Sequence, residues 1–150
     1  MIKLWLIFLA ALFSGNVLAC KCEASMIKLV GEKAEYIYSS SKNVFLAKIT
    51  RSTPVGKVKN DSTTLHYFEI IDSYKGNPEN FTFLQSGSEN PTSCNDDGMI
   101  EGSFYLVFTD TNNIFDCSVL EVEPDTDYFK KLFMFLSELR NKNVNAVRTE

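Results

Sequence analysis

The junction between residues 19 and 20 constrains the fold of this chain more than any other feature. An apolar leader ends at Ala19, and two cysteines one residue apart, Cys20 and Cys22, follow immediately. Cleavage after Ala19 makes Cys20 the first residue of the mature protein, with a free α-amine. If both cysteines are oxidised, the new terminus is tied to distant parts of the chain from its first residue onward.

Residues 1–19 have the three parts of a secretory signal peptide. A single charge at Lys3 precedes an apolar run over residues 4–13, and a polar break at residues 14–16 leads to the small Ala19. The apolar run is about ten residues long, whereas a membrane span needs about twenty, so a cleaved leader is favoured over an anchor. We therefore predict one exported domain of residues 20–150, secreted to the extracellular space.

Lipidation of Cys20 is the main alternative to simple cleavage. The sequence Leu18-Ala19-Cys20 partly matches a bacterial lipobox, but Asn16 and its polar neighbours fit that signal poorly. Lipid attachment normally ends in acylation of the same α-amine. In a bacterium, simple cleavage predicts a periplasmic protein and lipidation predicts a lipid-anchored one.

The charge balance disfavours several classes of partner. Without the leader, the chain has 14 basic and 19 acidic residues, a net charge of −5, and it has no basic block. Neither nucleic acid nor an anionic membrane surface is expected as a partner. The chain is 45% hydrophobic and 13% aromatic, which is enough for one core, and a monomer is expected.

All four cysteines (Cys20, Cys22, Cys94 and Cys117) follow the leader. An even number in a short exported chain predicts two disulfides, and four cysteines allow three pairings. A Cys20–Cys22 bond would close a very small strained ring, so we expect each of these two to bond a distant cysteine. A zinc site is not favoured, because no histidine is nearby and structural sites usually have Cys-x-x-Cys spacing.

Periodicity predicts a helix, five strands and a second helix. The ranges are a helix over 25–39, strands over 43–53, 63–74, 81–85, 103–109 and 114–123, and a helix from Asp125 or Thr126 to about Asn141. A turn is expected at residues 54–56. A small closed barrel of the OB type, a five-stranded Greek-key fold stapled by disulfides, accommodates these elements, and a β-sandwich is nearly as consistent with the pattern.

Side-chain patterns predict the faces of these elements. Phe68 and Ile70 mark the inward face of their strand, and residues 103–109 alternate as a strand buried on both faces. His66, the sole histidine, is predicted to lie at the surface or on a sheet edge, because no acid or nucleophile stands at a recognisable spacing from it. The last helix has a broad apolar stripe and should turn Lys130, Lys131, Glu138 and Arg140 toward water.

The order of features resembles the netrin-like domain of the tissue inhibitors of metalloproteinases. The shared features are Cys-x-Cys at the mature terminus, an early helix, NVFLAKI at 43–49, YKG at 74–76, Cys94, GSFYLVF at 102–108, and Cys117. They cover nearly all of the mature chain in order and spacing. The resemblance implies an OB barrel with disulfides Cys20–Cys94 and Cys22–Cys117.

The resemblance also implies a function, the inhibition of a zinc metalloendopeptidase. In those inhibitors the α-amine and carbonyl oxygen of the first cysteine chelate the zinc of the protease in place of its catalytic water. Here Cys20 would be the chelator and Lys21 would enter the primary specificity pocket. Cys22 would continue the edge, and an adjoining ridge would consist of Pro91, Thr92, Ser93 and Cys94.

Lys21 departs from the pattern, because matrix metalloprotease inhibitors usually place a small or uncharged side chain there. An ammonium group is costly to bury without a partner, so a protease with an acidic or open pocket suits this chain better. The extra disulfide and the second, cysteine-rich domain of those inhibitors also have no counterparts.

The alternative function is a non-inhibitory netrin-like binding module of the cell surface or extracellular matrix. An enzyme is not expected, since no paired carboxylates, phosphate loop or nucleophile with a base can be picked out, and no cofactor is predicted. Asn60 and Asn80 begin glycosylation sequons, which have meaning only in a eukaryotic host.

Overall fold

A computed structural model of the chain describes residues 32–58, 61–87, 99–114 and 118–147. The elements are α3 (Glu32–Ser40), β1 (Asn43–Val58), β2 (Asp61–Lys75), the 3-10 helix η1 (Pro78–Asn80), β3 (Leu84–Ser86), β4 (Phe104–Thr109), β5 (Val119–Val122) and α4 (Asp127–Val147). The strands form one antiparallel sheet in the order β3-β2-β1-β4-β5. The prediction of a mainly β fold with five strands and two helices is confirmed.

The two central strands of the sheet are apolar on both faces. In β1, Val44 and Leu46 face one cluster of buried side chains, while Phe45, Ala47 and Ile49 face a second one. Strand β4 divides in the same way, as its alternation predicted. Because successive side chains of a strand point to opposite faces, each face needs its own cover.

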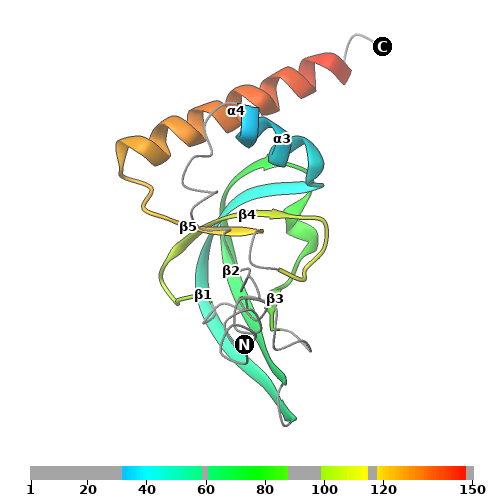
Figure 1. Cartoon of the computed structure of the whole chain (residues 1–150), viewed down its shortest axis with the longest axis vertical. Helices are drawn as coiled ribbons and strands as arrows, with labels where there is room; N and C mark the ends of the chain where they lie inside the picture. Colours follow the sequence, from blue (N-terminus) through cyan, green and yellow to red (C-terminus); the bar gives the residue numbers. More distant parts are fainter. Residues whose placement is uncertain (1–31, 59–60, 88–98, 115–117, 148–150) are drawn as a thin grey trace, which may run out of the picture.

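The two helices cover the first face. Both lie at one end of the sheet, and the β1–β2 hairpin extends away from them toward the opposite end (Figure 1). Ala34 and Tyr38 of α3 join Leu132, Leu136 and Leu139 of α4 over the sheet residues, and all five are buried. Neither described helix is both long and apolar enough to cross a membrane.

All five strands contribute side chains to the second cluster. Phe68 and Ile70 of β2 pack against it, as predicted, beside Leu84 of β3 and Val119 of β5. The sheet nevertheless does not close, because β3 and β5, three and four residues long, form no ladder with each other in the described part of the chain. Within the described residues, one parallel bridge, between Gln85 and Asn113, joins β3 to the chain ahead of β5.

The predicted turn at residues 54–56 is wrong, because β1 continues through it to Val58 and pairs with β2 as far as Asp61. The ladder with β4 ends at Lys48, so Pro54 lies in a part of β1 that pairs with β2 alone. Proline is tolerated there because an edge strand leaves one side of its backbone without ladder bonds.

Helix α4 also differs from its predicted range, since it runs six residues past Asn141 to Val147. Residues 142–147 contain neither glycine nor proline, so the sequence provides no stop signal there. The start agrees better with the prediction. The Thr126 carbonyl accepts the Lys130 N–H at 3.0 Å, which makes Thr126 the N-cap residue.

Candidate functional site

The predicted inhibitory residues lie outside the described residues. They are Cys20, Lys21, Cys22, Pro91, Thr92, Ser93 and Cys94, and Cys117 lies outside as well. Their roles and both disulfides therefore stay predictions. The described residues that flank the segments 88–98 and 115–117 can be examined directly.

The flanking residues come from one region of the fold. The Gln85 N–H donates to the Asn112 carbonyl at 2.7 Å, and the Ile114 N–H donates to the Gln85 carbonyl at 2.9 Å. Met99, which follows segment 88–98, packs in the second cluster together with Ile114, which precedes segment 115–117. The chain therefore enters or leaves both cysteine-bearing segments beside the same end of β3.

His66 is the largest departure from the sequence-based expectation, because it is fully buried rather than at the surface or on an edge. It lies in β2 opposite Ser52 of β1 and Leu84 of β3. Its Nδ1 lies 2.8 Å from the Ser52 hydroxyl, and its Nε2 lies 2.7 Å from the Ser86 hydroxyl. Both ring nitrogens thus have partners, which compensates for the cost of burying a polar ring.

The surrounding hydrogen bonds define one tautomer of His66. The Ser52 hydroxyl donates to the Met99 carbonyl at 3.1 Å, so its oxygen is free to accept from Nδ1–H. The Ser86 hydroxyl can then donate to the lone pair of Nε2. Burial disfavours the imidazolium form and lowers the pKa of His66.

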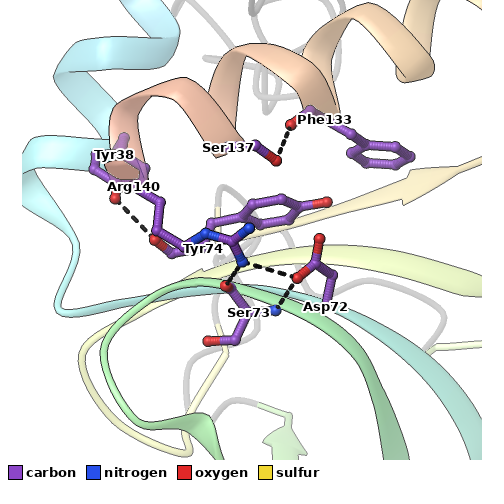
Figure 2. Close-up of polar contacts among 7 residues, drawn as sticks. All are labelled: Tyr38, Asp72, Ser73, Tyr74, Phe133, Ser137 and Arg140. Carbon is purple, nitrogen blue, oxygen red and sulfur yellow. Dashed lines mark hydrogen bonds and ion pairs between the residues drawn. The ribbon is translucent and has the colours of Figure 1, made fainter. Parts of the chain in front are cut away.

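A second polar cluster fastens both helices to β2 (Figure 2). The Tyr38 hydroxyl of α3 donates to the Tyr74 carbonyl at 2.8 Å. From α4, Arg140 donates to the Ser73 carbonyl at 2.7 Å and pairs with Asp72 at 3.1 Å. Arg140 was predicted to face water, and its side chain is 39% exposed, but its guanidinium group also reaches back to the sheet.

Aromatic packing completes this cluster. The ring of Phe133 stacks on that of Tyr74, with centroids 6.3 Å apart and planes 12° apart. Burial, followed by the Asp72 carboxylate, raises the pKa of Tyr74, and burial raises the pKa of Tyr38. The side chains of this cluster hold α3 and α4 in place, so their roles are structural.

Sequence reasoning missed His66 and Arg140 for one reason. Each depends on partners far along the chain: Ser52 and Ser86 are 14 and 20 residues from His66, and Asp72 is 68 residues from Arg140. Local periodicity assigns a face to a residue, but it does not reveal such partners. In the described ranges there is no group of three or more histidine, cysteine or acidic residues that could hold a metal ion.

The described chain is thus a mainly β domain, an open five-stranded antiparallel sheet with two helices on one face. No protein-family model matches the sequence, and a search of curated proteins finds no significant match.

Proposed function

We propose that this chain is an exported inhibitor of a zinc metalloendopeptidase, with a netrin-like domain of the tissue-inhibitor type. The inhibitory group is the α-amine and carbonyl oxygen of Cys20, held by disulfides Cys20–Cys94 and Cys22–Cys117. The observation that carries the proposal is the common origin of the two cysteine-bearing segments beside β3. It supports disulfides from the Cys20–Cys22 unit to both distant cysteines for a geometric reason, and the resemblance implies which cysteine bonds which.

Cys20 and Cys22 are two residues apart, so their Cα atoms are separated by at most about 7 Å. Each disulfide joins Cα atoms about 4.4–6.8 Å apart. Cys94 and Cys117 must therefore lie within about 20 Å of each other. The direct hydrogen bonds between Gln85 and residues 112–114, and the shared packing of Met99 and Ile114, make that requirement easy to meet.

The strand arrangement supports an OB-type barrel as the finer description of the fold. Every strand contributes to the second cluster, and the single bridge between Gln85 and Asn113 joins the β3 edge to the chain just before β5. Bulges in the β1–β2 ladder, including one between Ile49 and Arg51, allow long strands to coil. We propose an OB-type barrel that stays open between its edge strands β3 and β5.

The proposed mechanism needs only the terminus and the partner's metal. A neutral amine is a good zinc ligand, and a ligand in the open position excludes the water that would attack the peptide bond. An α-amine has a pKa of about 8, so part of it is neutral at pH 7, and zinc favours loss of the remaining proton. Two disulfides that fix the terminus reduce the entropy lost on docking.

The experiment compares two oxidised proteins against a panel of zinc endopeptidases. One begins at Cys20, and the matched control carries one additional alanine before it. The extension converts the amine to an amide and removes a metal bond worth about 3 kcal/mol, so the inhibition constant should rise about 100-fold. Equal potency of the two forms would rule out chelation.

Lys21 favours one competing function, a non-inhibitory netrin-like binding module, because its ammonium group is costly to bury in an apolar pocket. A Lys21→Ala protein separates the two cases. Better inhibition by this variant, against a protease with an apolar pocket, supports an inhibitor whose target differs. No inhibition by either form, with the fold intact, supports the binding module.

A further inference from the structure

His66 joins four parts of the described chain. It belongs to β2, and its ring contacts Ser52 of β1 and Ser86 of β3. Through the Ser52 hydroxyl it is also linked to the Met99 carbonyl, at the start of the segment that precedes β4. Strand β3 pairs with β2 at three positions, and the Ser86 contact adds a side-chain bond between the two strands.

The hydrogen bonds of this junction are matched to the neutral ring. The Ser52 hydroxyl donates to Met99 and accepts from Nδ1–H, while Nε2 accepts from the Ser86 hydroxyl. Protonation places a hydrogen on Nε2, so the Ser86 hydroxyl can no longer donate to this nitrogen and must turn its own hydrogen away to accept from Nε2–H instead. It also places a positive charge on a side chain with no exposed surface.

Among the described residues, the charged groups around the junction do not compensate that charge. On β1, Arg51 lies over the Tyr67 ring at 4.2 Å, and the neighbouring β3 residues Leu84–Ser86 carry no charge. In the segment before β4, the Glu101 carboxylate accepts the Ser52 N–H at 2.7 Å and is exposed. On β2, Glu69 is exposed. Within the described residues, both hydrogen-bond partners of the imidazole are hydroxyl groups.

We propose that His66 is an acid-sensitive latch, which fastens β3 and Met99 to the β1–β2 hairpin when neutral and releases them when protonated. The proposal does not depend on the inhibitory function. The sign follows from the lowered pKa of His66 in the folded state, compared with about 6.5 in the unfolded chain. The junction is therefore at full strength above about pH 7.5, and it weakens as the pH falls through 6.5 toward the folded-state pKa.

The fact that His66 is the sole histidine makes the first test unambiguous. An NMR titration of the imidazole in the oxidised mature protein should give a pKa below 6.5, with Nδ1 as the protonated nitrogen of the neutral form. A pKa of 6.5 or higher would overturn the proposal, because protonation would then cost the fold nothing. This measurement uses the natural protein, so it does not depend on the folding of any variant.

The second test measures stability and its location. Between about pH 7.5 and about pH 5, the unfolding equilibrium constant should rise by up to about tenfold per pH unit, the limit for one proton. The His66→Gln variant lacks this group, so its stability should change less over the same range. An equal change in both proteins would assign the effect to carboxylates and refute the latch.

Amide exchange locates the opening in the natural protein. After correction for intrinsic exchange rates, acid should reduce the protection of Leu84 and Ser86 more than that of Leu106 at the centre of β4. A uniform loss over both strands would mean global destabilisation rather than release of β3, and it would contradict the latch.

Discussion

The Tyr38 hydroxyl is predicted to contribute measurably to the attachment of α3 to the sheet. In the Tyr38→Phe variant the ring stays and only the hydroxyl group is lost. The Tyr74 carbonyl accepts a hydrogen bond from that hydroxyl at 2.8 Å. Tyr74 is only 2% exposed, so the variant leaves this carbonyl without that partner in a buried position. An unpaired buried acceptor costs about 1–3 kcal/mol, and lower desolvation of the phenylalanine ring offsets part of it. We expect a net loss of about 1–2 kcal/mol in the free energy of unfolding.

The same helix provides a matched control. Tyr36 is 73% exposed, so Tyr36→Phe should change the free energy of unfolding by less than about 0.5 kcal/mol. Urea unfolding under non-reducing conditions, followed by far-UV circular dichroism, measures both variants. Tryptophan fluorescence is not suitable, because the sole tryptophan, Trp5, lies in the predicted leader.

The loss expected for Tyr38→Phe corresponds to a fall in Tm of about 3–8 °C for a domain of this size. If both tyrosine variants unfold at the same urea concentration with the same slope, the hydroxyl does not hold α3 to β2. That result would refute the argument from the buried hydrogen bond. The attachment of α3 would then depend on its apolar contacts and on the Lys75 ammonium group, which donates to the Tyr38 and Ser39 carbonyls.

Three further predictions follow from the described residues and the expected disulfides. Gly76→Ala should destabilise the protein more than Gly102→Ala. Both glycines have positive φ, 77° and 86°. A Cβ at Gly76 collides with the Asn43 side chain and the Lys42 carbonyl, whereas a Cβ at Gly102 faces open space. Equal thermal midpoints for the two variants would contradict the close approach. In an alkaline spectrophotometric titration, Tyr38 and Tyr74 should ionise only above their usual pKa of about 10. Because their folded-state pKa values are raised, the free energy of unfolding should fall as the pH rises above about 10. Ionisation of every tyrosine at its usual pKa, without unfolding, would refute this prediction. A reductant should lower Tm, since each long-range disulfide contributes up to about 4 kcal/mol, and an unchanged Tm would argue against both bonds.

The sequence predicted those parts of the fold in which neighbouring residues carry the information. The continuous apolar run in β4 correctly predicted burial on both faces, and Phe68 with Ile70 correctly marked the inner face of β2. These predictions succeed because a strand alternates its faces every residue, whatever its partners are.

The predictions that were wrong concern features that no local pattern specifies. These features depend on distant partners or on the lengths of other strands. His66 is buried since hydroxyl groups from two neighbouring strands satisfy both of its nitrogens. Pro54 does not end β1, because the β4 ladder has already stopped at Lys48 and leaves an edge there. Closure of the barrel was predicted from the element count and from the resemblance, neither of which reveals how short β3 and β5 are.

For the candidate site, sequence provided every residue and the structure provides the setting. The cysteine pattern and its resemblance to the inhibitors predict an inhibitory tip. The described strands add that both segments bearing the distant cysteines begin or end beside β3.

The intact mass of the secreted protein, measured with and without reduction and with its first residue identified, tests the central claim most directly. The account predicts a chain that begins at Cys20, carries an unmodified amine and gains four hydrogens on reduction. A chain that begins elsewhere, an acylated Cys20 or thiols that are already reduced would contradict it.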